Sequence, residues 1–163
     1  MVEIELLALR DDLPMGGPVL WLRESGGARV LAITIGAREA ESIGWALEGV
    51  EFPRPMTHDL LRDVIEVLGA SVERVCITKV ENGTFHADLV LRRGADELSV
   101  SARPSDAVAV AVRTGVPLFA EEDVLEIAGV VLEEDEGTEL DEGEMVEQFR
   151  EFLEAVQPED FAG

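Results

Sequence analysis

Cysteine is almost absent from this chain, and so are the residue clusters that mark several common chemistries. The single cysteine, Cys76, excludes an internal disulfide, and the N-terminus lacks a signal-peptide pattern, so we expect a cytoplasmic protein. No apolar run approaches the roughly 18 residues of a membrane span, so we expect no membrane partner. The chain also lacks a Gly-rich phosphate loop, a zinc-type Cys/His cluster and a Gly-x-Ser-x-Gly nucleophile motif.

Basic residues are also scarce. There are 13 Lys and Arg against 35 Asp and Glu, which gives a formal net charge of -22. Residues 1–120 hold 12 of the basic and 18 of the acidic residues, whereas residues 121–163 hold 1 and 17. An acidic chain repels phosphate backbones at long range, which disfavours tight nonspecific binding to DNA or RNA. A local basic cleft within residues 1–120 remains compatible with this charge.

The hydrophobic pattern predicts an α+β fold with a mainly antiparallel sheet packed against helices. Alternating apolar residues predict strands at 2–10, 18–23, 29–35, 72–80, 84–91 and 97–102. Helical spacing and turn residues predict helices at 37–50, 57–68, 107–113 and 121–128, with a short extended piece at 117–119. The helix that starts at Thr57 has one apolar stripe, which we expect to be buried: Leu60, Leu61, Val64, Ile65 and Leu68.

The acidic C-terminal part reads as a separate unit, which divides the chain into 1–132 and 133–163. Residues 133–143 are acidic and interrupted by glycine, the composition of a linker. An amphipathic helix is predicted after them from the spacing of Met145, Phe149, Phe152, Leu153 and Val156. Such a helix cannot bury its apolar face alone, so it docks on residues 1–132, on another subunit or on a protein partner.

The first candidate site is the start of the helix that begins at Thr57. A proline-stiffened approach precedes Thr57, which we expect to be the N-cap, with His58 and Asp59 in the first turn. Helix N-termini attract anions through their free N–H groups. We therefore consider Arg54 and Thr57 for substrate binding, His58 as an acid or base, and Asp59 as a metal ligand. The alternative is a capped helix with His58 and Asp59 at the surface.

A second candidate, Arg103-Pro104-Ser105-Asp106, repeats this pattern where a strand meets the next helix. Here Arg103 and Ser105 could bind an anion, and Asp106 could act in catalysis or hold a metal. The alternative is N-capping by Ser105 or Asp106, with Arg103 paired to Asp106. Two helix starts that each follow an arginine could also face one cleft.

Two further carboxylates are candidates for metal binding. Glu39 lies at the start of the predicted helix 37–50, where matching the helix dipole is the alternative role. Asp88 shares one face of a strand with His86, two residues away, and an exposed sheet face is the alternative there.

Several segments together resemble one protein family, in order and with suitable spacing over residues 2–130. They are 29–36 (RVLAITIG) with Glu39 and Ala40, 53–61 (PRPMTHDLL), 82–87 (NGTFHA) and 102–109 (ARPSDAVA). The family is that of the bifunctional nucleases, whose domain is also called the DNase-RNase domain or domain of unknown function 151. The resemblance implies an α+β domain that hydrolyses phosphodiester bonds in DNA and RNA.

By position in these motifs, the residues with usable catalytic chemistry are His58, Asp59, Arg103 and Asp106. If the chain is a nuclease, the number of carboxylates in and near these motifs predicts a divalent metal, Mg²⁺ or Mn²⁺, because such ions prefer oxygen ligands; otherwise we expect no cofactor. The ligands that we consider for it are Asp59, Asp106, Asp88 and Glu39.

Two readings without catalysis stay open beside the nuclease. In one, the chain is a binding module for a nucleotide, another anionic ligand or a protein partner. In the other, it is a structural homo-oligomer whose C-terminal helices exchange between subunits.

Overall fold

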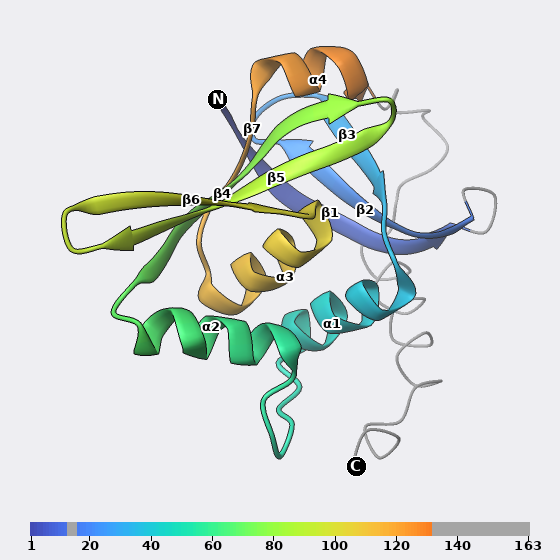
Figure 1. Cartoon of the computed structure of the whole chain (residues 1–163). Coiled ribbons are helices and arrows are strands. Elements are labelled where there is room, and N and C mark those ends of the chain that lie inside the picture. The colour runs from blue at the N-terminus through green and yellow to red at the C-terminus, as the bar shows by residue number, and fades with distance from the viewer. Residues whose placement is uncertain (13–15, 132–163) are drawn as a thin grey trace.

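The computed structural model describes residues 1–12 and 16–131, which form a twisted sheet with helices packed on it (Figure 1). The predicted α+β class is confirmed, whereas the predicted linker and C-terminal helix lie outside the described residues. The strands are β1 (Val2–Asp12), β2 (Gly17–Glu24), β3 (Arg29–Thr34), β4 (Ser71–Glu81), β5 (Thr84–Arg93), β6 (Asp96–Ala102), β7 (Leu118–Ala120) and β8 (Val130–Val131). The helices are α1 (Ala37–Leu47), α2 (Thr57–Val67), α3 (Pro104–Thr114) and α4 (Glu122–Ala128).

The eight described strands form one sheet in the order β6-β5-β4-β7-β1-β2-β3-β8. Short β7 joins the two hairpin groups, because it pairs in parallel with β4 and antiparallel with β1. The other neighbouring strands are antiparallel. The expected tight turn at Asn82-Gly83 connects β4 to β5, and both residues have positive φ, 49° and 77°, as a type I′ hairpin turn requires.

Helix α3 lies at the centre of the molecule and is surrounded by α1, α2, β4 and β5. Its consecutive residues 107–111 (AVAVA) are at most 3% exposed, so nearly every side of the helix is covered. Small side chains allow this, because they let neighbouring backbones approach closely on all faces. The helix starts at Pro104, three residues before the predicted start, and proline is well suited to the first helical position.

One expectation about α2 is wrong. Of the apolar stripe that the sequence predicts to be buried, only Ile65 is buried within the chain, and Leu60, Leu61, Val64 and Leu68 are exposed. The helix instead turns His58 and Ile65 inward, toward the side on which it contacts α3. Amphipathic spacing shows that a face is apolar but does not show what covers it.

None of the helices within residues 1–12 and 16–131 is long and apolar enough to cross a membrane.

The crowded position of α3 predicts that Ala109→Leu will destabilise the fold. Ala109 has no exposed surface, so the larger side chain must displace its neighbours, at a cost of about 1–3 kcal/mol. Urea unfolding followed by circular dichroism measures the change. Ile127→Ala on the exposed side of α4 is the control and should change stability by less than about 0.5 kcal/mol. An equal loss in both variants would contradict the central packing of α3.

Candidate functional site

A chain of hydrogen bonds through His58 connects the three helices that lie together below the sheet in Figure 1. His58 comes from the start of α2 and is 8% exposed. Its Nδ1 lies 2.8 Å from the Ser42 hydroxyl on α1, and its Nε2 lies 3.0 Å from the Asp106 carboxylate on α3. In the tautomer that carries its proton on Nε2, the ring donates to the Asp106 carboxylate, and its Nδ1 accepts the hydroxyl proton of Ser42.

Arg103 extends this chain to the surface. Its Nε donates to Asp106 Oδ2 at 2.7 Å, and its Nη2 donates to Asp106 Oδ1 at 3.0 Å and to Glu39 Oε1 at 2.9 Å. The side chain is nevertheless 66% exposed. No partner for Nη1 is found in the part of the chain that the structure describes. Arg103 is therefore held in place by two carboxylates while one edge of its guanidinium faces outward.

Arg103 and Asp106 stabilise each other's charged forms. Burial works to raise the pKa of Asp106, but hydrogen bonds from Arg103 and His58 outweigh it and lower that pKa. Hydrogen bonds to Asp106 and then to Glu39 raise the pKa of Arg103 further above its usual range. The arginine stays charged and Asp106 stays ionised at neutral pH.

Arg113, which the sequence pattern did not single out, holds Ser42, the hydrogen-bond partner of His58 Nδ1. Its side chain is 5% exposed, and its Nε donates to Asp59 Oδ1 at 2.6 Å. Its Nη2 donates to the Ser42 carbonyl at 3.0 Å and to the Ser42 hydroxyl at 3.1 Å, and its Nη1 donates to the Ala109 carbonyl. Its sequence signal was a charged residue in a helix built mostly of small residues. That signal does not indicate a functional residue, because an arginine in the last turn of a helix commonly interacts with the helix dipole.

Asp59 acts as a cap and an ion-pair partner. Its second oxygen accepts the backbone N–H of Met56 at 3.0 Å, and Met56 rather than the expected Thr57 is the N-cap of α2. Burial works to raise the pKa of Asp59, but hydrogen bonds from Arg113 and from the Met56 N–H outweigh it and lower that pKa.

A pocket of about 390 Å³ lies beside Arg103. Three segments line it: the end of β3 through Gly36, the turn from β4 into β5, and Arg103, Pro104 and Ser105 at the start of α3. Ser105 is 6% exposed, and its hydroxyl has no hydrogen-bond partner within residues 1–12 and 16–131. The start of α3 likewise has no side-chain cap among these residues. Unpaired donors, a helix N-terminus and an arginine together suit an anion.

Gly36 has a specific role at the edge of this pocket. A Cβ at this position would overlap the Glu39 carboxylate. The absence of a side chain therefore lets Glu39 fold back over the start of α1 and reach Arg103.

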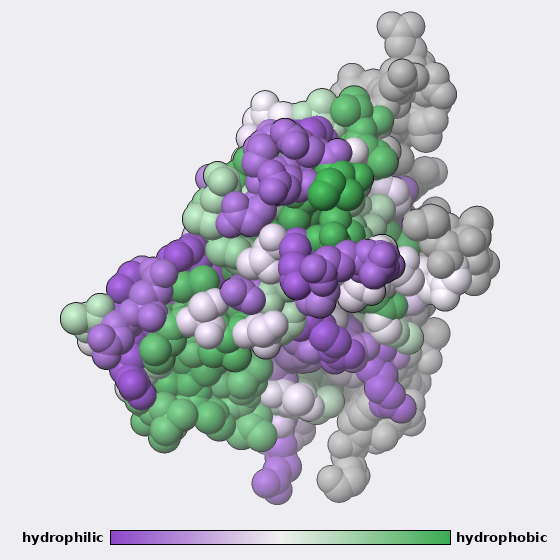
Figure 2. All heavy atoms as spheres, turned by 45° about the horizontal axis from the view of Figure 1, so that its top comes forward, coloured by the Kyte–Doolittle hydropathy of each residue, from purple (hydrophilic) through white to green (hydrophobic). Residues whose placement is uncertain are grey.

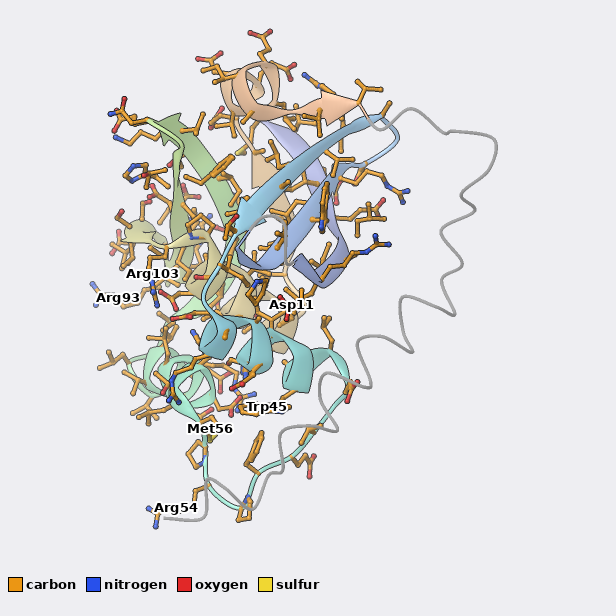
Figure 3. All side chains as sticks on the ribbon, turned by 90° about the vertical axis from the view of Figure 1, so that its right-hand side faces the viewer. Asp11, Trp45, Arg54, Met56, Arg93 and Arg103 are labelled. Carbon is orange, nitrogen blue, oxygen red and sulfur yellow. The ribbon has the colours of Figure 1, made fainter. Side chains whose placement is uncertain are left out.

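The remaining predicted site residues lie apart from this group. Arg54 is exposed in the loop between α1 and α2, and Figure 3 shows its side chain pointing away from Arg103. Thr57 is exposed at the first position of α2. Asp88 accepts a hydrogen bond from Ser99 at 2.7 Å on the sheet face opposite to that of the buried Ala87 and Leu89.

The four carboxylates considered as metal ligands are accordingly not gathered. Glu39 and Asp106 share Arg103, Asp59 pairs with Arg113, and Asp88 lies on the other face of the sheet. Among residues 1–12 and 16–131, no group of three or more His, Cys, Asp and Glu side chains is placed to hold a metal ion. The described residues thus do not form a ready-made site for Mg²⁺ or Mn²⁺.

Comparisons with known proteins agree on one family. The family description that matches residues 20–133 is the bifunctional nuclease domain. An uncharacterized protein of Mycobacterium tuberculosis is 46% identical over 164 residues, covering 99% of this chain and 98% of that protein. Bifunctional nuclease 1 of Oryza sativa is 29% identical over 116 residues, and bifunctional nuclease 2 of Arabidopsis thaliana is 29% identical over 98 residues. These matches cover 69% and 58% of this chain but only 35% and 30% of the plant proteins.

The ion pair between the buried guanidinium of Arg113 and the partly buried Asp59 predicts a pH-dependent loss of stability in Asp59→Asn. At pH 7 the variant should be less stable by about 3 kcal/mol, because a buried guanidinium loses its counter-ion. The folded-state pKa of Asp59 is lowered, so the ion pair stabilises fully above about pH 4 and is lost as the pH falls through that lower value. The difference between wild type and variant should therefore stay constant down to about pH 4 and shrink as the pH falls further, in urea unfolding.

Asp63→Asn is the matched control for this measurement. Asp63 also lies on α2 and pairs with an arginine, Arg62, but its side chain is 43% exposed. An exposed pair contributes little, so the control should lose less than about 1 kcal/mol at any pH. A loss in Asp59→Asn that stays constant down to pH 3 would refute the role of the charge.

Proposed function

We propose that this chain, which belongs to the bifunctional nuclease domain family, cleaves phosphodiester bonds of DNA and RNA at the pocket beside Arg103. One observation supports this location above the others. Arg103 is held by Asp106 and Glu39 at the pocket edge with Nη1 facing outward, next to the unpaired Ser105 hydroxyl and the uncapped start of α3.

The pocket offers the groups that a phosphate needs. Nη1 of Arg103 supplies two N–H donors, the Ser105 hydroxyl supplies one more, and the first N–H groups of α3 point along the helix axis toward its start. Donors fixed before the substrate arrives stabilise charge that develops on a phosphoryl oxygen without further rearrangement. In this proposal Arg103 and Ser105 bind the phosphate.

His58 has a supporting role in this arrangement. It is buried, and both of its ring nitrogens are engaged, one by Ser42 and one by Asp106. We therefore treat it as a positioning residue that holds Asp106, which in turn holds Arg103, rather than as the group that meets the substrate. Asp59 acts indirectly, because it pairs with Arg113, which donates a hydrogen bond to the Ser42 hydroxyl.

Dependence on Mg²⁺ or Mn²⁺ remains a prediction from the residue types of the sequence. The nearby carboxylates are already paired with arginines, so no step of the proposal is assigned to the ion. Substrate binding by Arg54 and Thr57 also remains a prediction, since both lie away from the pocket.

A binding module for an anionic ligand is the second candidate, and the pocket volume favours it. A volume of about 390 Å³ lies within the ~300–1,000 Å³ range of small-ligand sites and suits a nucleotide-sized molecule. The same donors would bind the ligand, without cleavage.

The nuclease proposal predicts that Arg103→Gln abolishes most of the cleavage. Fluorescent DNA and RNA oligonucleotides are incubated with highly purified wild type or variant, in Mg²⁺, in Mn²⁺ or in EDTA. Loss of one preorganised charged donor should lower the cleavage rate about 100-fold. Loss of all wild-type cleavage in EDTA is the result expected from metal dependence.

Arg23→Gln is the matched control. Arg23 is also an exposed arginine paired with a carboxylate, that of Glu5, but it lies at the end of β2 remote from the pocket. Its cleavage rate should match that of wild type within about twofold. Equal rates in wild type and Arg103→Gln would place the activity elsewhere or in a contaminant, and absence of cleavage in wild type would contradict the nuclease.

The binding-module candidate predicts a thermal shift instead. Nucleoside mono-, di- and triphosphates at saturating concentration should raise the melting temperature of wild type, because a ligand that binds only the folded state stabilises it. Ser105→Ala should reduce the shift, and the ligand should be recovered unchanged. Lack of any shift in wild type would exclude these ligands.

A further inference from the structure

The apolar face of α2 is unusually open for a helix with this pattern. Val67 is 86% exposed, Leu68 68% and Leu60 53%. Leu61 and Val64 on the same helix are also exposed. Figure 2 shows hydrophobic side chains gathered at its lower left, where Figure 1 has α2 and, above it, the hairpin of β5 and β6.

Strand β6 continues this apolar surface from the sheet. Leu98 and Val100 pair with Leu91 and Leu89 of β5, so they lie on the sheet face that is buried further inward. Both are themselves exposed, because the helices do not extend over this edge. We call Leu60, Leu61, Val64, Val67, Leu68, Leu98 and Val100 the α2–β6 surface.

The backbone of β6 is open as well. The strand lies at the end of the sheet order, and six of its seven residues are exposed. Among the described strands it pairs only with β5. An uncovered edge of this kind presents a row of free N–H and C=O groups, which another strand can pair with.

The size of the surface decides whether it needs a partner. Its seven residues are 36% to 86% exposed, which amounts to about 600 Å², at the upper end of the ~300–600 Å² of the largest apolar patch on a typical monomer. Each partner in a stable interface of standard size buries about 800 Å². The surface is therefore large enough to form most of one such interface.

We propose that a second copy of this chain covers the α2–β6 surface, in a two-fold dimer that brings α2 and β6 of each copy against those of the other. A second copy supplies both things that the surface lacks, an open strand edge and an apolar helix face of equal size. A two-fold axis satisfies both copies at once, since the same patch meets itself.

The charges around the surface fit this occupant better than a basic partner. Despite the net charge of -22 of the whole chain, the nearby charged residues carry both signs. On α2, Arg62 and Asp63 pair and offset each other, whereas Arg92 and Glu97 pair on the sheet face opposite to Leu98 and Val100. The seven residues of the surface are themselves uncharged, and a neutral ion pair beside them does not repel a second copy. The chain's own C-terminal segment starts after β8, at the opposite edge of the sheet from β6.

The oligomeric state of the full chain tests the proposal. Light scattering coupled to size-exclusion chromatography should give twice the monomer mass for wild type at micromolar concentration. Val67→Lys on α2 and Val100→Lys on β6 should each halve that mass. Both positions are exposed within one chain, so the variants keep the fold, and circular dichroism checks this. If Val67→Lys fails to fold, Val100→Lys still carries the test.

Ile127→Lys is the matched control, because Ile127 is 71% exposed on α4 and lies outside the α2–β6 surface. It should keep the wild-type mass. A monomeric wild type overturns the proposal and leaves the surface to the C-terminal segment or to another protein. A dimer that survives both lysine variants, or one that Ile127→Lys also dissociates, overturns it too.

Hydrogen exchange tests the part of the proposal that concerns the strand edge. The amides of residues 96–102 should exchange more slowly as the protein concentration rises through the dissociation constant. Dimer formation without this slowing would overturn the pairing of β6 with its copy.

Discussion

The buried guanidinium of Arg113 is the contact on which the functional region depends. It reaches Asp59 on α2 and both the hydroxyl and the carbonyl of Ser42 on α1, from the last turn of α3. A buried charge is tolerated only when it is paired and hydrogen-bonded, so these partners must keep their positions relative to one another. This requirement fixes the relative placement of the three helices more specifically than apolar contact alone.

A series of hydrogen bonds connects Arg113 to the surface residue Arg103. Ser42 orients His58, His58 orients Asp106, and Asp106 with Glu39 holds Arg103 at the pocket. Each link is a hydrogen bond with a charged or buried partner, the kind that is strongest and most directional. An exposed arginine, which would otherwise sample many rotamers, is thereby presented in one orientation next to the Ser105 hydroxyl.

Sequence reasoning singled out much of this region but missed two residues that hold it together. The two helix starts that follow Arg54 and Arg103 could face one cleft by their sequence, and in the structure a hydrogen bond between His58 and Asp106 joins them. Arg54 itself does not, because the loop before α2 carries it away (Figure 3). Ser42 and Arg113 could not have been found, since a serine in a helix and a last-turn arginine are ordinary residues until the packing of three helices brings them together.

The sequence alone determined the α+β class, the hairpins, the turn at Asn82-Gly83 and the family, because these follow from local periodicity, turn chemistry and motif order. Tertiary structure alone decided which charged groups pair and which apolar faces are covered. Both depend on contacts between residues far apart in the chain, such as the 54 positions that separate Asp59 from Arg113. The apolar stripe of α2 shows this most clearly. The sequence predicts the stripe, but only the structure shows that most of its side chains are exposed.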